Sequence, residues 1–134
     1  MKIFCTAEFE KIFKRLSKKN AYRDLEKEIV EYFFAENIDF SGSRRLGGHA
    51  ENPYIKKRLG GSGGYRAYFY IIVKDNSLYL MFLHPKTGPD GSTNITDEAK
   101  TQLLRDLISD IKSKRLLCVT KHESKEQLVF TVAE

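Results

Sequence analysis

Basic side chains gather in one stretch of this 134-residue sequence, between Ser43 and Arg66. That stretch has a single acid, Glu51, although the formal charge of the whole chain is only +5. Its basic residues are Arg44, Arg45, Lys56, Lys57, Arg58 and Arg66. Because side chains alternate between the two faces of a strand, Lys56 and Arg58 are predicted to be neighbours and Lys57 to point the other way. Strand pairing across residues 60–64 brings Arg66 to the face of Lys56 and Arg58, so the spacing favours a phosphodiester backbone as the partner.

The basic stretch also has a simpler interpretation. Lysines and arginines commonly lie on the edge strands of sheets, where their charge prevents edge-to-edge aggregation. The six basic side chains would then be solvated and would bind no partner. Spacing alone does not decide between a solvated edge and a phosphate-binding face.

Other chemistries find little support in the residues. The glycine-rich segment 60–64 lacks the G-x-x-x-x-G-K-[ST] pattern of a P-loop, and a strand rather than a helix is predicted to follow it. No serine lies in a nucleophile-elbow context. The histidines, His49, His84 and His122, are too far apart for a metal motif, so neither a metal nor a cofactor is predicted. Cys5 and Cys118 lie in apolar stretches and are expected to be buried, reduced thiols.

Hydrophobic periodicity predicts the N-terminal elements. A short strand, 2–5, precedes a helix that Thr6 caps and whose apolar residues follow i, i+3, i+4, i+7 spacing. A second amphipathic helix is predicted from Asn20 to about Asn37, so that the two helices form a hairpin. The polar stretch 39–53, which includes Arg44, Arg45 and His49, is predicted to be a loop.

The second half of the chain is predicted to be mainly β-structure. Three strands, 54–59, 65–73 and 78–84, form an antiparallel meander with a turn at 74–77. Arg66 is predicted to share its face with Tyr68 and Tyr70. A helix begins after Thr96, and two apolar runs, 116–119 and 128–132, indicate a terminal strand pair.

The predicted fold class is α+β. An N-terminal helical hairpin is expected to pack on a small, mainly antiparallel sheet, with a C-terminal helix and a short β tail. The composition, 41% hydrophobic and 31% charged, suits a single globular domain over 1–134, with 115–134 as a C-terminal extension. That tail either extends the sheet or covers a functional surface. Because no apolar run has the length of a signal peptide or a membrane span, a cytoplasmic protein is predicted.

The sequence resembles the RelE/ParE toxin superfamily, and its HigB-like branch most closely. The resemblance covers roughly Lys2 to Lys114 in element order. It depends on a Lys-x-Arg strand at 56–58, Gly-Gly-Tyr-Arg at 63–66 and Phe-Leu-His-Pro-Lys at 82–86. It implies a microbial-RNase-like fold and the toxin of a type II toxin–antitoxin system, a ribosome-dependent endoribonuclease that cleaves mRNA and inhibits translation. A cognate antitoxin of helix-turn-helix type, the ribosome and mRNA are the implied partners, with no membrane.

Residue roles follow from the resemblance by position. Lys56 and Arg58 match the family's basic pair, Arg66 its strand arginine, and Lys86 a basic residue after the third meander strand. Cleavage without a metal requires a base for the 2′-hydroxyl, charge stabilisation at the phosphorane and an acid for the 5′-oxygen. The expected catalytic residues are Lys56, Arg58, Arg66, His84 and Lys86, and the expected RNA-binding residues are Arg44, Arg45, Lys57, Tyr68 and Tyr70.

Individual roles can be suggested for some of these residues. Like charges around Lys56 should lower its pKa and favour a general base, while the planar fork of Arg66 suits phosphate oxygens. Tyr68 or Tyr70 is expected to stack on a base. His84 is either a turn residue or a proton-transfer group beside Lys86.

Two alternatives share the same fold. Well-studied RelE members have an arginine and then a tyrosine beyond the third strand, whereas Thr-Gly-Pro-Asp-Gly occupies 87–91 here. This departure leaves the general acid unassigned and favours a noncatalytic RNA-binding or partner-binding domain. The other alternative is a ParE-like inhibitor of DNA gyrase, against which the presence of Lys56, Arg58 and Arg66 argues.

Overall fold

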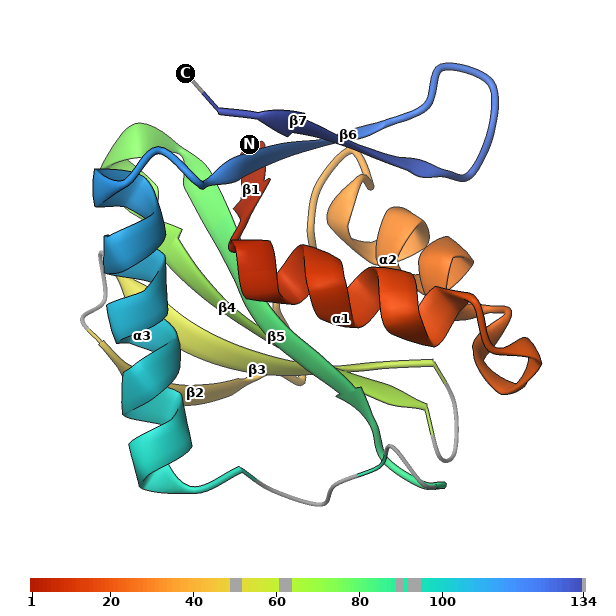
Figure 1. Ribbon diagram of the computed structural model, residues 1–134, viewed down its shortest axis with the longest axis horizontal. Coiled ribbons are helices and arrows are strands. Elements are labelled where there is room, and N and C mark those ends of the chain that lie inside the picture. Colours follow the sequence, from red (N-terminus) through yellow and green to blue (C-terminus); the bar gives the residue numbers. More distant parts are fainter. Residues whose placement is uncertain (49–51, 61–63, 89–90, 92–94, 134) are drawn as a thin grey trace.

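The computed structural model describes residues 1–48, 52–60, 64–88, 91 and 95–133. These residues form a sheet with helices on both of its faces (Figure 1). The strands are β1 (Lys2–Cys5), β2 (Arg44–Gly48), β3 (Pro53–Leu59), β4 (Tyr65–Ile72), β5 (Ser77–Pro85), β6 (Leu117–Lys121) and β7 (Leu128–Val132). The helices are α1 (Ala7–Ser17), α2 (Leu25–Phe33) and α3 (Asp97–Lys112), with short 3-10 helices η1 (Asn20–Tyr22) and η2 (Val73–Asp75). No helix among the described residues has the length and apolarity to cross a membrane.

The sheet has seven strands in the order β2-β3-β4-β5-β1-β6-β7. Only β1 and β5 pair in parallel, and every other neighbouring pair is antiparallel. The α+β class and the mainly antiparallel sheet are therefore confirmed, but the sheet is larger than predicted. One reason is the terminal strand pair, which was expected: β6 pairs with β1, so the tail extends the sheet (blue in Figure 1).

Two predictions about the N-terminal half are corrected. The stretch 39–53 was predicted to be a loop because its glycines and arginines show no strand pattern, but it contains strand β2. The second helix begins at Leu25 rather than Asn20, because η1 and a turn occupy the intervening residues. The expected pairing of α1 and α2 as a hairpin is not confirmed; both helices pack on the same side of the sheet.

The sheet separates two hydrophobic cores. Alternation along β1 directs Ile3 and Cys5 into the core under α1 and α2, and Phe4 to the opposite side. We call these two sides the α1/α2 face and the α3 face. On the α3 face, Leu103 and Leu107 of α3 pack on side chains of the sheet. Cys5 is buried, which raises the pKa of its thiol, whereas Cys118 is only half-buried; both are free thiols.

The first turn of α1 is fixed by residues far apart in the sequence. Thr6 is the N-cap, and its Oγ1 accepts a hydrogen bond of 3.1 Å from the backbone N–H of Phe9. The buried carboxylate of Asp110, on α3, accepts a 2.8 Å hydrogen bond from the N–H of Ala7. A carboxylate at a helix N-terminus also interacts favourably with the helix dipole. Asp110 therefore links the two helical layers past β1.

Candidate functional site

Strand register places four basic side chains side by side on the α3 face. Arg44 on β2 lies directly opposite Lys56 on β3, and Arg58 on β3 lies directly opposite Arg66 on β4. Together with Gly42 they line a cavity of about 170 Å³, which we call the basic cavity. The predicted common face of Lys56, Arg58 and Arg66 is thus present, and Arg44 joins it.

A tight turn brings Arg44 to the basic cavity. The backbone N–H of Ser41 donates a 2.9 Å hydrogen bond to the carboxylate of Asp39, and Ser43 N–H donates to Phe40 O at 3.1 Å. Between them Gly42 has φ of +75°, a left-handed conformation that favours glycine. The turn reverses the chain into β2, so that Arg44 pairs with Lys56 at the sheet edge.

The basic cavity has an excess of positive charge. No carboxylate of the described residues lies within ion-pair distance of Arg44, Arg58 or Arg66. Arg66 is only 5% exposed, and one of its guanidinium N–H groups donates to Tyr65 O at 3.2 Å. Burial, and then the charge of Arg58, lowers the pKa of Arg66. A buried cation without an acidic partner is unfavourable unless an anion binds beside it.

Lys56 has a lowered pKa, as the sequence predicted. Burial is the largest cause, followed by the positive charges of Arg66 and Arg44, and by Lys100 of α3. Crowding by like charge, the cause expected from the sequence, is therefore secondary to burial. A lysine with a lowered pKa has a larger neutral fraction near neutral pH and can accept a proton.

A β-bulge brings His84 to the same face. Phe69 pairs with Leu80 but Tyr68 pairs with Phe82, so Met81 is an extra residue in β5. Strict alternation from Leu80, which packs in the α1/α2 core, would have put His84 on the α1/α2 side. The extra residue reverses the alternation, and His84 lies directly opposite Arg66.

The tautomer of His84 follows from its hydrogen bonds. Nδ1 lies 2.8 Å from Pro85 O, which can only accept, so Nδ1 carries the proton. Nε2 of the neutral ring then accepts a 3.0 Å hydrogen bond from the hydroxyl of Tyr68. Burial lowers the pKa of His84, and the charges of Lys56 and Arg66 lower it further, although the bond to Pro85 opposes the shift. His84 is 4% exposed and both ring nitrogens are occupied.

Several predicted site residues lie outside the basic cavity. Lys57 is on the α1/α2 side, where its Nζ donates to Ser41 O at 3.0 Å and lies 5.2 Å from the centre of the Tyr32 ring. Arg45 lies opposite Ile55, whose side chain belongs to the α1/α2 core. Lys86 is exposed beyond the end of β5 and does not line the cavity. Their predicted roles stay predictions.

The two predicted stacking tyrosines also differ from expectation. Tyr68 is 1% exposed and lies beneath Lys56, so its ring has no free face for a nucleobase. Tyr70 is half-buried, opposite Tyr54 and Tyr79, and does not line the basic cavity. A stacking role for Tyr68 is therefore not supported. Its hydrogen bond to His84 is the contact that sequence reasoning missed, because only the bulge brings the two side chains together.

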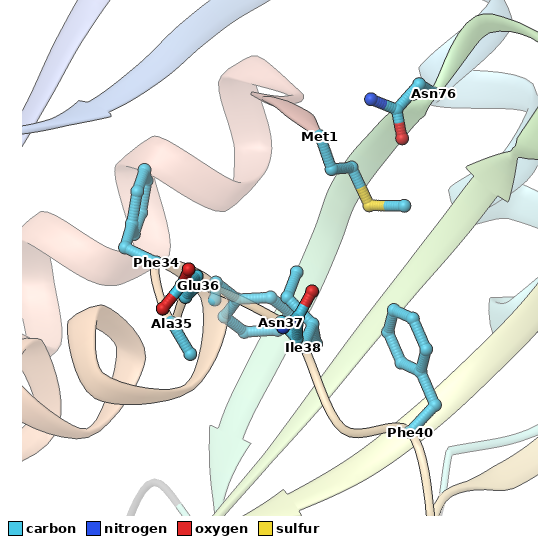
Figure 2. A pocket seen from close by; sticks show the side chains of 9 residues that line it. Met1, Phe34, Ala35, Glu36, Asn37, Ile38, Phe40 and Asn76 are labelled. Atoms are coloured by element: carbon cyan, nitrogen blue, oxygen red, sulfur yellow. The ribbon is translucent and has the colours of Figure 1, made fainter.

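A second, larger cavity shares no lining residue with the basic cavity. Figure 2 shows the side chains that line it. It has a volume of about 430 Å³ and is lined by the end of α2, the segment 34–40, Met1 and Asn76. Among the described residues that line it, Glu36 has the only ionisable side chain, and Ile38 and Phe40 are among the apolar ones. It offers no group of catalytic residues, so the basic cavity is the better candidate site.

Some predictions fall outside the described residues. These are His49, most of the glycine segment 60–64, and parts of the segments 87–91 and 94–96. Within the described part of the chain, no three His, Cys, Asp or Glu side chains form a group that could hold a metal ion.

Comparison with known proteins gives no relative of this chain. No family model, no curated protein and no solved structure matches it.

Proposed function

We propose that this chain binds single-stranded RNA in the basic cavity and cleaves it without a metal. It would act as a toxin endoribonuclease of the RelE/ParE type that its sequence resembles. The observation that carries the proposal is that two cross-strand pairs of like charge, Arg44 opposite Lys56 and Arg58 opposite Arg66, line one cavity. Like charges directly opposite on a sheet destabilise the fold by roughly 0.2–1 kcal/mol per pair relative to neutral residues. A bound phosphate attracts both members of each pair and so offsets their repulsion.

The solvated-edge interpretation accounts less well for these contacts. Charges that protect a sheet edge are exposed to water, whereas Arg66 is 5% exposed and lies on β4, two strands in from the edge strand β2. A guanidinium in that place presents planar N–H donors that match the oxygens of a phosphate. The buried arginine therefore favours a bound anion.

The proposed reaction is an internal transfer of the phosphoryl group. Lys56 takes the proton of the 2′-hydroxyl, and the 2′-oxygen forms a bond to the adjacent phosphorus. Arg58 and Arg66 stabilise the negative charge that develops on the two non-bridging oxygens. The bond from phosphorus to the 5′-oxygen breaks, and that oxygen takes a proton from water or from an exposed cation such as Arg58. The products are a 2′,3′-cyclic phosphate and a 5′-hydroxyl end.

The biological context in the proposal comes from the resemblance. Translated mRNA on the ribosome would be the substrate, and a helix-turn-helix antitoxin would be the inhibitory partner. The chemistry of the cavity requires only a phosphodiester with a neighbouring 2′-hydroxyl. Substrates in which this hydroxyl is replaced by hydrogen should bind but remain uncut.

Induced expression in bacteria tests the proposal. Wild type should arrest growth and produce new mRNA ends in a translation-dependent manner, whereas Lys56→Met should reduce cleavage by about 10²–10⁴-fold. Lys57→Met is the matched control, because it removes the same charge from the neighbouring residue on the opposite face. It should retain cleavage.

The alternatives give different results. RNA binding that weakens steeply with salt, without any cleavage by wild type, would identify a noncatalytic RNA-binding domain. DNA breaks that depend on gyrase would identify a ParE-like inhibitor. Equal cleavage by wild type and Lys56→Met would contradict the role of Lys56.

A further inference from the structure

Aromatic rings lie directly beneath the basic cavity. The Nζ of Lys56 is 5.9 Å from the centre of the Tyr68 ring. Tyr68 in turn stacks on Phe82, with ring centres 5.8 Å apart, and meets the edge of His84 at 5.6 Å. A cation within about 6 Å of a ring centre is attracted by the negative face of that ring. The face of the Tyr68 ring therefore lies next to the side-chain nitrogen of Lys56 and favours one position for it, although nearby cations repel its charged form.

The Tyr68 ring is itself fixed at its far end. Its hydroxyl donates to Nε2 of His84, which is an acceptor only because Pro85 O holds the proton on Nδ1. A chain of contacts thus runs from a backbone carbonyl through His84 and Tyr68 to Lys56. Tyr68 and His84, the two side chains in the middle of this series, are almost completely buried and, unlike Arg66, are not among the described residues that line the basic cavity.

We propose that Tyr68 and His84 are positioning residues that hold the amine of Lys56 at the basic cavity. The inference rests on the proposed function, in which this amine accepts the 2′-hydroxyl proton. A lysine side chain has several rotatable bonds, and holding it in one conformation is costly in entropy. Proton transfer nevertheless requires the amine to lie within hydrogen-bond distance of the hydroxyl. His84, for which the sequence left open a turn role or proton transfer beside Lys86, acts in this proposal on Lys56 through Tyr68.

Cleavage kinetics of two Tyr68 variants test the proposal. Tyr68→Leu removes the ring beneath Lys56 and should lower kcat by about 10- to 100-fold while KM stays near its wild-type value, because the arginines still bind phosphate. Tyr68→Phe keeps the ring but loses the bond to His84, so its loss should be smaller. Tyr79→Leu is the control, because Tyr79 is a buried ring on the same face that stacks on Phe4 rather than on Tyr68. It should lower stability and leave kcat close to wild type.

A double substitution separates positioning from a general loss of structure. In a Lys56→Met background, Tyr68→Leu should reduce stability as before but should not change the residual rate of cleavage. If Tyr68→Leu lowers the rate equally in both backgrounds, its effect does not pass through Lys56 and the proposal is wrong. Unchanged kcat in Tyr68→Leu would also overturn it.

Nuclear magnetic resonance gives a test that needs no cleavage. The ε-methylene protons of Lys56 should show a ring-current shift in wild type and Tyr68→Phe, and should lose it in Tyr68→Leu. Nitrogen shifts should identify the Nδ1–H tautomer of His84. If wild type proves unable to cut RNA, the proposed function fails while these shifts still decide on positioning. A Lys56 signal without a ring-current shift, or an Nε2–H tautomer, would overturn the positioning even in an active enzyme.

Discussion

The α3 face of the sheet has two halves with opposite properties. In the covered half, Tyr54, Tyr79 and Met81 lie beneath Leu103 and Leu107 of α3. The other half, which we call the open half, is the basic cavity, where Gly42 and four basic residues are the described residues that form the lining, and these include two cross-strand pairs of like charge. The first arrangement stabilises the fold, and the second opposes folding. Strand β3 supplies residues to both halves, Tyr54 to the covered half and Lys56 and Arg58 to the open half, and this difference is why we propose a ligand for the open half.

The largest effect is expected from disrupting the covered half. Leu107 is 3% exposed, so Leu107→Ala should lower the free energy of unfolding by about 2–5 kcal/mol through lost burial and a residual cavity. Urea denaturation measures the change. Ile108→Ala on the same helix is the control, because Ile108 is 52% exposed and should change stability little. Equal losses for the two variants would show that α3 does not pack as described.

A smaller loss is expected at the junction of the two halves. The hydroxyl of Tyr54 donates a 3.0 Å hydrogen bond to Lys100 O at the start of α3. Tyr54→Phe removes only this bond and should cost about 0.5–1.5 kcal/mol of stability in denaturant unfolding. Tyr70→Phe is the matched control, since its hydroxyl has no hydrogen-bond partner among the described residues. A larger loss in the control would contradict the role of the bond in holding α3.

In the open half, a substitution is expected to raise the free energy of unfolding rather than lower it. Arg58→Met removes one member of a like-charge pair and should raise the free energy of unfolding by about 0.2–1 kcal/mol while weakening RNA binding. Added salt screens the repulsion, so the gain should shrink as ionic strength rises. Lys57→Met, on the other face, should show no such gain. A fold weakened by Arg58→Met would mean that the pair is not repulsive.

The smallest effect is expected from pH, because it concerns one proton on one side chain. The pKa of His84 is lower in the folded chain than its ordinary value near 6.5, so the unfolded chain binds more protons below that pH. Stability should therefore fall as pH decreases below about 6.5 and should not change through this group above it. The measurement is the difference in urea midpoint between wild type and His84→Gln at pH 7.5 and pH 5. A difference that stays constant would refute the shift.

The sequence predicts part of the arrangement of the α3 face, where local geometry alone determines it. Alternation along a strand follows from covalent geometry, so the common face of Lys56, Arg58 and Arg66 was predicted correctly. The side of the sheet on which His84 lies depends on one extra residue, Met81, which no periodicity reveals. Strand β2 was missed because Gly47 and Gly48 weaken the signal of a strand that gains its stability from pairing with β3. The side on which His84 lies and the formation of β2 therefore both depend on strand pairing, which the sequence pattern does not show.

The place of β1 in the sheet has a consequence for folding during synthesis. This strand precedes every other described strand in the sequence, yet it lies between β5 and β6, which are made much later. Similarly, the hydrogen bond from the N–H of Ala7 to the carboxylate of Asp110 can form only after α3 has been made. The 2.8 Å hydrogen bond from the N–H of Leu128 to the carboxylate of Glu26 can form only after β7 has begun. By contrast, the strands of the basic cavity follow one another in the chain and can pair early. Contacts so distant in sequence slow folding, so the middle of the sheet should close only after β6 has been made.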